Sequence, residues 1–156
     1  MKTVYLFIFF VSLFASAQAQ SRNKTIYGEL GGPGGFSVNF DTRLSAKPTG
    51  IGLRVGMGYA PSLLVSALTV PLGVNVLAGK NRHYFEAEGG VSFVHMFGSD
   101  SKDWFSTDPA SEWIKYVYAG YRYKAPDGFT ARIGFCPMFA EGQAGLGMGV
   151  SVGYSF

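Results

Sequence analysis

Cysteine, long apolar runs and clusters of one charge are all scarce in this sequence. The single cysteine, Cys136, has no partner for an internal disulfide, so the fold has to be held by other interactions. Beyond the N-terminal segment, no stretch approaches the roughly 20 apolar residues that a membrane-spanning helix needs. A membrane-embedded form of this chain would therefore be a β-barrel.

Charged residues make up only 15% of the chain, and the formal net charge is +3. Lysine and arginine do not gather in a run, which argues against a nucleic-acid partner. Histidine and cysteine lack the spacing of metal ligands, and we expect no cofactor. The segment GGPGG at 31–35 lacks the GK[ST] ending of a phosphate-binding loop and is interpreted as a turn.

The first 19 residues have the three parts of a secretory signal peptide. Lys2 supplies the positive start, 4–15 the apolar middle, and Ala17-Gln18-Ala19 the cleavage site. We expect cleavage after Ala19, which leaves 20–156 as a single domain. The alternative is an uncleaved anchor, for which the apolar run is short.

What the sequence does contain is alternation with a period of two, most clearly at 143–156. Apolar residues occupy every second position from Leu146 to Phe156, and glycine or serine occupies the positions between them. A strand places alternate side chains on opposite faces, so one face is apolar and the other nearly bare. Glycine is unfavourable inside a soluble strand, whereas in a transmembrane barrel the apolar face meets lipid and the bare face points into a narrow lumen.

Seven more segments alternate in the same way between turn signals. The predicted strands are 25–31, 36–44, 50–59, 67–77, 83–93, 113–123, 129–138 and 143–156. They predict an all-β fold: an eight-stranded antiparallel up-and-down transmembrane β-barrel. Pro71 weakens the fourth strand, because proline cannot donate to the ladder. The connections after strands two, four and six are tight, which places them with both termini on the periplasmic side.

The face opposite the apolar one collects four acids and four arginines. These predicted inward residues are Glu29, Asp41, Arg43, Arg54, Glu86, Glu88, Arg122 and Arg132. Buried charges are tolerated when paired, and the arginine fork fits carboxylates, so we predict an interior ion-pair lattice. Side chains fill a barrel of this size. The alternative is a proton or solute path through the lattice, which would make the protein a narrow passive channel.

Two alternatives concern the apolar face and catalysis. In a soluble barrel, the apolar face would line the interior and aromatic residues near strand ends would be core. In an outer-membrane lipid-modifying enzyme, His83 or His95 would act with a serine and a glutamate, but nothing in the sequence fixes their spacing. We assign no catalytic residue.

The longest irregular segment, 95–112, is rich in serine, aspartate and proline and is predicted to be a loop. It contains Trp104 and Phe105, which are candidate contacts for an external ligand or partner. The alternative is a solvated connection whose aromatic side chains fold back onto the barrel rim.

Several fragments resemble small, largely uncharacterised outer-membrane β-barrel proteins of Bacteroidota-type bacteria. They are YGELGGPGGFSVNFDTRL at 27–44, TGIGLRVGMGYAP at 49–61, LTVPLGVNVLAGKNRHYFEAEGG at 68–90, AGYRYKAPDGFTARIGFCPMF at 119–139 and GVSVGYSF at 149–156. The resemblance implies a C-terminal aromatic, Phe156, recognised by the barrel-assembly machinery during biogenesis. It implies no established activity, so no catalytic residues are carried over.

The predicted function is therefore a non-enzymatic protein of the cell outer membrane, in contact with outer-membrane lipid. Its polar interior is packed, and its role is structural or one of surface interaction. The external ligand or partner does not follow from the sequence.

Overall fold

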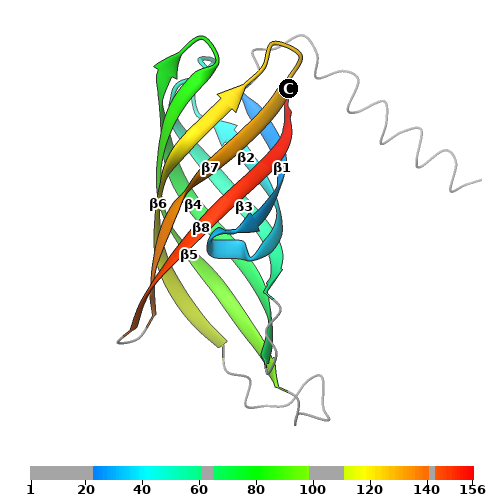
Figure 1. Cartoon of the computed structure of the whole chain (residues 1–156), viewed down its shortest axis with the longest axis vertical. Helices are drawn as coiled ribbons and strands as arrows, with labels where there is room; N and C mark the ends of the chain where they lie inside the picture. Colours follow the sequence, from blue (N-terminus) through cyan, green and yellow to red (C-terminus); the bar gives the residue numbers. More distant parts are fainter. Residues whose placement is uncertain (1–22, 61–64, 99–110, 141–142) are drawn as a thin grey trace, which may run out of the picture.

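Eight strands form a single closed barrel in the computed structural model, which describes residues 23–60, 65–98, 111–140 and 143–156. The elements are β1 (Lys24–Gly31), the short 3-10 helix η2 (Gly32–Gly34), β2 (Phe36–Arg43), β3 (Gly50–Ala60), β4 (Val65–Lys80), β5 (His83–Gly98), β6 (Ser111–Lys124), β7 (Phe129–Ala140) and β8 (Gln143–Ser155). Each strand pairs antiparallel with the next, and β8 pairs with β1 (Figure 1). The predicted up-and-down barrel is confirmed. Among these residues, no helix is long and apolar enough to cross a membrane.

The barrel has two different ends. The turn end carries the connections 44–49, 81–82 and 125–128 together with the start of β1 and the end of β8. There the backbones of Lys24 and Phe156 exchange two hydrogen bonds, of 2.8 and 3.2 Å. At the opposite end, the loop end, β4 and β5 reach furthest, up to the Val65↔Gly98 pair.

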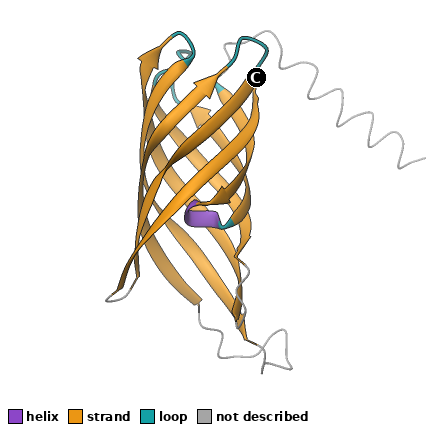
Figure 2. Cartoon of the chain, viewed as in Figure 1, coloured by secondary structure: helices purple, strands orange, loops and turns teal. Residues whose placement is uncertain are grey.

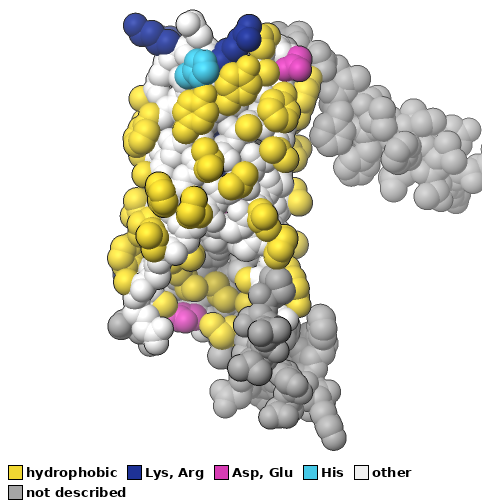
Figure 3. All heavy atoms as spheres, in the orientation of Figure 1, with side chains coloured by type: hydrophobic (Ala, Val, Ile, Leu, Met, Phe, Trp, Pro, Cys, Tyr) yellow, Lys and Arg dark blue, Asp and Glu magenta, His cyan; other side chains and the backbone are white. Residues whose placement is uncertain are grey.

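Apolar side chains cover the outside of the barrel. On β8, Met148, Val150, Val152 and Tyr154 are exposed, while Ser151 is buried. Figure 3 shows hydrophobic side chains spread over the barrel wall, and Lys and Arg gathered at the turn end. Phe36 is 56% exposed. The soluble alternative, with the apolar face inside, is therefore wrong, because the bulky apolar residues have the parity of the outer face.

Several strands are longer than the alternation predicted. β5 continues to Gly98 and β6 begins at Ser111, so His95 and Glu112 belong to strands and not to the predicted loop. The physical reason is pairing: His95 faces both Leu68 and Ser111 in the ladders, and these backbone bonds override the loop-like composition. Trp104 and Phe105 lie outside the described residues.

Pro71 and Pro137, which lie inside described strands, each interrupt the ladder on one side of their strand. Between β3 and β4 the pairing runs from Val55↔Leu72 to Gly58↔Thr69, and the missing positions include Pro71. On its other side, Pro71 still pairs with Ser92. Pro137 of β7 lies at an equivalent gap, facing β6. The register is the same before and after each gap. The strand predicted around Pro71 therefore forms, and the missing N–H of proline interrupts pairing with only one of its two neighbouring strands.

The turn between β1 and β2 folds into the barrel. Figure 2 shows η2 about half way along the barrel, far from the loop end. Its Pro33 carbonyl accepts a hydrogen bond from Ser92 Oγ at 3.0 Å, and its Gly34 carbonyl accepts one from Thr69 Oγ1 at 2.8 Å. Gly31 and Gly35 flank the turn with φ of 80° and 67°, values that favour glycine. The predicted turn is present, but its inward position was not predicted.

Candidate functional site: the interior charge lattice

All eight charged residues predicted to face inward lie inside the barrel. None is more than 4% exposed, and they come from β1, β2, β3, β5, β6 and β7. They point inward because they share strand parity with the glycines and serines of the bare face. Every one of them takes part in at least one ion pair of 2.6 to 3.4 Å. We call this connected set the charge lattice.

Four members of the charge lattice form a closed ring of alternating sign. Arg54 contacts Glu29 at 2.7 Å and Glu88 at 3.2 Å. Arg132 contacts the same two glutamates at 3.2 and 3.4 Å. Each guanidinium thus contacts two carboxylates, and each carboxylate contacts two guanidiniums. Every charge in the ring is therefore balanced by charges of opposite sign.

The other members extend from the ring toward the turn end. Glu86 accepts two hydrogen bonds from Arg122, at 2.6 and 2.8 Å, and two from Arg132, at 2.9 and 3.0 Å. Arg122 then reaches Asp41 at 3.2 Å, and Asp41 pairs with Arg43 at 2.6 Å. Arg122 and Arg132 are direct partners in the β6–β7 register, so Glu86 separates two like charges that the ladder places together.

Neutral side chains complete the hydrogen bonds of the charge lattice. Asn39 Oδ1 accepts from Arg54 Nε at 3.0 Å, and Tyr116 donates to Glu88 at 2.7 Å. Ser151 donates to Glu29 at 3.2 Å, and Asn75 contacts both Asp41 and Arg43. Sequence reasoning did not assign these residues to the site. Their parity was the available signal, since they occupy the same inward positions as the charged residues.

Two buried tyrosine rings lie against the guanidinium groups. The Cζ atom of Arg132 lies 4.5 Å from the ring centroid of Tyr27 and 4.8 Å from that of Tyr118. Arg54 approaches the Tyr27 ring at 5.6 Å. Cations at these distances are attracted to the ring faces. The hydroxyl groups of Tyr27 and Tyr118 are buried and have no hydrogen-bond partner among the described residues.

The inward glycines provide the space that the long side chains occupy. A Cβ at Gly56 would lie 2.1 Å from Asn39 Oδ1, and one at Gly52 would lie 2.2 Å from Arg43 Cζ. At Gly73 it would lie 2.5 Å from the Tyr116 hydroxyl. The small inward residues therefore leave the space that the charge lattice fills: glycines on one strand accommodate large side chains from other strands.

The residues of the hydrolase alternative are not brought together among the described positions. His83 lies on the outer face, where its ring contacts those of Tyr121 and Tyr123, while Glu86 and Glu88 point inward. His95 hydrogen-bonds to Ser111 at 2.9 Å near the loop end. Ser92 donates to the η2 turn.

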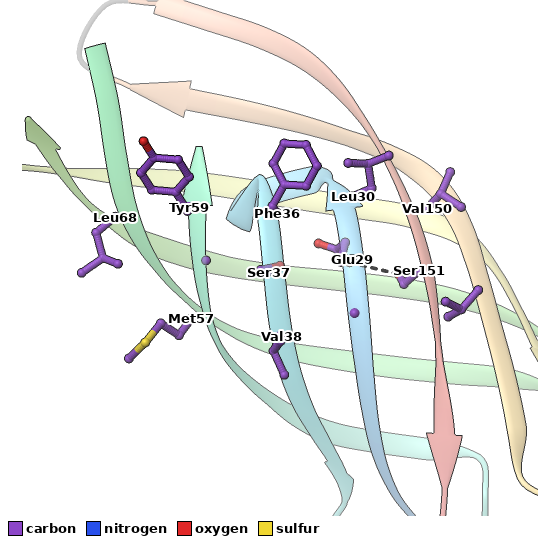
Figure 4. Close-up of a pocket in the computed structure, with 13 residues that line it drawn as sticks. Glu29, Leu30, Phe36, Ser37, Val38, Met57, Tyr59, Leu68, Val150 and Ser151 are labelled. Carbon is purple, nitrogen blue, oxygen red and sulfur yellow. Dashed lines mark hydrogen bonds between the residues drawn. The ribbon is translucent and has the colours of Figure 1, made fainter. Parts of the chain in front are cut away.

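A groove of about 720 Å³ lies on the outer face over β1 and β2, with further lining from β3, β4 and β8. Figure 4 shows its apolar lining, which includes Leu30, Phe36, Val38 and Met57. The hydrogen bond between Glu29 and Ser151 is drawn beside it. The groove therefore lies on the outer side of the barrel wall directly over Glu29 and Ser151 of the interior.

Comparison with known proteins finds no matching family model and no matching curated protein. Among solved structures, the N-terminal β-barrel domain of Pseudomonas aeruginosa OprF matches with a TM-score of 0.67 at 13% identity, covering 86% of this chain and 96% of that one. The chain has the fold of eight-stranded outer-membrane barrels. Ail, the attachment invasion locus protein of Yersinia pestis, solved in complex with the heparin analogue sucrose octasulfate, matches with a TM-score of 0.51 at 10% identity, covering 86% and 95% of the two chains. These likenesses support the barrel part of the sequence resemblance, and the link to Bacteroidota-type bacteria stays a prediction.

Proposed function

We propose that this chain is an outer-membrane barrel with a sealed lumen, acting as a structural or surface-interaction protein. The observation that carries this proposal is the charge lattice, in which eight buried charges from six strands are paired across the barrel interior. An ion crossing the lumen would have to break these pairs. The inward η2 turn adds a second obstruction on the loop side of the lattice.

The apolar outer face supports placement in a lipid bilayer. Bulky apolar residues cover it, as expected where a barrel wall meets hydrocarbon. Aromatic residues such as Tyr121, Tyr154 and Phe129 lie on this face near the turn end, where the interface with water is expected. In this proposal the turn end faces the periplasm and the loop end the exterior. The signal peptide and the recognition of Phe156 by the assembly machinery remain predictions.

The surface-interaction role draws on the shape of the molecule and on its fold. With the lumen filled, the parts left to meet a partner are the ends of the barrel. Ail shares the fold and is described as an attachment invasion locus protein, which is consistent with such a role here. The predicted contacts Trp104 and Phe105, in the segment beyond β5, are the first candidates for alanine substitution in a binding assay.

Planar-bilayer recording tests the sealed lumen. Purified 20–156 is refolded, its insertion is verified by a heat-dependent shift in gel mobility, and the current is recorded. We expect no steady conductance steps. Steps of uniform size that change with Arg54→Ala would contradict the proposal and favour the narrow passive channel.

Cell fractionation tests the location. The full chain is expected in the outer-membrane fraction, with a band that moves on the gel after boiling. A soluble band that does not shift on boiling would contradict the membrane assignment.

A further inference from the structure

One cation inside the barrel has no part in the charge lattice. Lys124, at the end of β6, is only 8% exposed, and its Nζ atom is buried with no hydrogen-bond partner among the described residues. No ion pair among the described residues joins Lys124 to the four carboxylates of the charge lattice, each of which is already paired with arginine. An ammonium group removed from water without a partner is strongly unfavourable. The Lys124 ammonium therefore favours an anion or an acceptor in direct contact, which the described residues do not supply.

A second buried N–H donor near Lys124, on Arg43, also lacks a hydrogen-bond partner among the described residues. Arg43 uses its terminal nitrogens on Asp41, Asn75 and the carbonyl of Gly50, but its Nε is buried and has no partner among the described residues. Arg122 and Arg43 lie close enough to repel the Lys124 ammonium, and Asp41 and Glu86 lie close enough to attract it, but none of them forms a hydrogen bond with it. Within the described part of the chain, the turn end of the barrel interior thus has two buried N–H donors, Lys124 Nζ and Arg43 Nε, without a hydrogen-bond partner.

Lys124 lines a pocket of about 800 Å³ that opens at the turn end. We call it the turn-end pocket; Pro48, Asn81, Arg82, Tyr84 and Ser155 also line it. Its lining contains Arg82 and Lys124 but no aspartate or glutamate. Tyr84 donates its hydroxyl to the Asn81 carbonyl at 2.8 Å, and no hydrogen bond joins it to Lys124 Nζ.

The surface around the turn-end pocket is also basic. Lys24, Lys47, Lys80 and Arg82 lie at this end of the described chain, and Asp127 is the only described acidic side chain among its turns. The Asp127 carboxylate accepts a hydrogen bond from the Phe129 backbone N–H at 3.2 Å. An approaching anion therefore meets an excess of positive charge at the rim and an unpaired ammonium inside.

We propose that the turn-end pocket binds a small phosphate-type oxyanion, with Lys124 Nζ as the buried contact and Arg82 at the rim. Phosphate offers several acceptor oxygens and a charge that an ammonium and a guanidinium both recognise. The group can come from free phosphate in the aqueous phase or from the headgroup of a lipid. This proposal does not depend on the lumen being sealed, because the pocket lies on the turn side of the charge lattice.

The first experiment titrates inorganic phosphate into the refolded barrel in nonionic detergent, at constant ionic strength set with chloride. The thermal midpoint of wild type is expected to rise with phosphate. Lys124→Met is expected to lower the apparent phosphate affinity by roughly tenfold or more, since it removes the buried contact. Lys115→Met removes the same charge from an exposed position of β6 away from the turn end and should keep the wild-type response. An equal rise in wild type and Lys124→Met, or no rise in wild type, overturns the proposal.

A second measurement does not depend on any variant folding. Nitrogen-15 NMR of the lysine ammonium groups in wild type should show the Lys124 signal shifting with phosphate and not with chloride. An unchanged Lys124 signal means that internal water satisfies the ammonium and rejects the site.

Repeating the titration in nanodiscs distinguishes the two sources. If a lipid headgroup is the ligand, discs containing phosphatidylglycerol shift the Lys124 signal without added phosphate, whereas pure phosphatidylcholine discs do not. If free phosphate is the ligand, both discs respond only to added phosphate. Conductance is a separate readout, so failure of this proposal is distinguishable from failure of the sealed lumen.

Discussion

At the scale of single residues, the interior of this barrel depends on pairing each charge of the charge lattice. Glu86 is the clearest case, because it stands between two arginines that the β6–β7 ladder places opposite each other. Both guanidiniums donate two hydrogen bonds to it. Removing that one negative charge leaves two positive charges unseparated.

We expect Glu86→Gln to lower the free energy of unfolding by roughly 3–5 kcal/mol, since it breaks buried pairs and points an amide donor at guanidinium donors. Urea titration in detergent measures the loss. Asp127→Asn is the control: Asp127 lies in an exposed turn and the amide oxygen can still accept the Phe129 N–H, so a change of about 0.5 kcal/mol or less is expected. Equal stability of Glu86→Gln and wild type would show that the ion pairs do not hold the barrel.

Two buried tyrosines give a matched pair of hydroxyl deletions. Tyr116 donates to Glu88, whereas the Tyr27 hydroxyl has no partner among the described residues. Tyr116→Phe should cost roughly 1.5–3 kcal/mol, the range for a hydrogen bond to a charged group, and Tyr27→Phe should be neutral or stabilising. Thermal unfolding of both variants tests the contrast, and a larger loss for Tyr27→Phe would contradict it.

At the scale of elements, the paired strands β1 and β8 show that glycine has a different role on each face of the barrel wall. Gly28 of β1 lies on the outer face between Val38 and Val152, and an added Cβ would meet no atom within 4 Å. Gly153 of β8 lies on the inner face, where an added Cβ would be 2.1 Å from the Ile26 carbonyl oxygen.

Valine at these two positions should have opposite effects. Gly28→Val should raise stability by roughly 0.5–1 kcal/mol, because a β-branched residue suits a strand better than glycine does. Gly153→Val should lower it by roughly 1–3 kcal/mol through overpacking. Chemical denaturation of the two variants measures both changes, and the same sign in both would contradict this assignment of faces.

The η2 turn is the other element whose position can be tested. Its carbonyls are bound by Thr69 and Ser92, so Thr69→Val combined with Ser92→Ala removes both anchors. Amide hydrogen exchange at Gly32 and Gly34 should then become faster, since local opening costs less. Thr42→Val, on the outer face of β2, serves as the control. Unchanged exchange in the double variant would show that the turn is held by other contacts.

At the scale of the whole molecule, the charge lattice is neutral and sealed from solvent. Its ion pairs have side chains with 0% exposure, so dissolved salt has little access to them. The free energy of unfolding should therefore change by less than about 1 kcal/mol between low and about 1 M sodium chloride, because buried pairs are screened far less than surface pairs. Denaturation series at several salt concentrations test this. A steep loss with salt would mean that water and ions reach the lattice.

The sequence was sufficient to predict which side chains face inward and which face outward, but it was insufficient to predict which charged residues pair with each other. Parity alone oriented Glu29 and Arg132 inward, but these residues are 103 positions apart, and only closure of the barrel brings them to 3.2 Å. Lys124 shows the limit most plainly. The predicted strand ended at residue 123, whereas β6 runs one residue further and turns Lys124 into the interior. The inward direction of the GGPGG turn could not be predicted from the sequence, because the same residues favour a turn whether it points into the barrel or away from it.

Because the charge lattice draws its residues from six strands, it also affects the rate at which the protein unfolds. The β1–β8 ladder joins Thr25 to Ser155 and closes the barrel around the four carboxylates and four guanidiniums. We expect these groups to be hydrated until that closure. Their water is lost late in folding and must be regained early in unfolding, in a step that disturbs many pairs at once. Such a barrier slows unfolding more than it changes the equilibrium. The folded barrel should consequently persist for long periods in conditions where, at equilibrium, it would no longer be favoured.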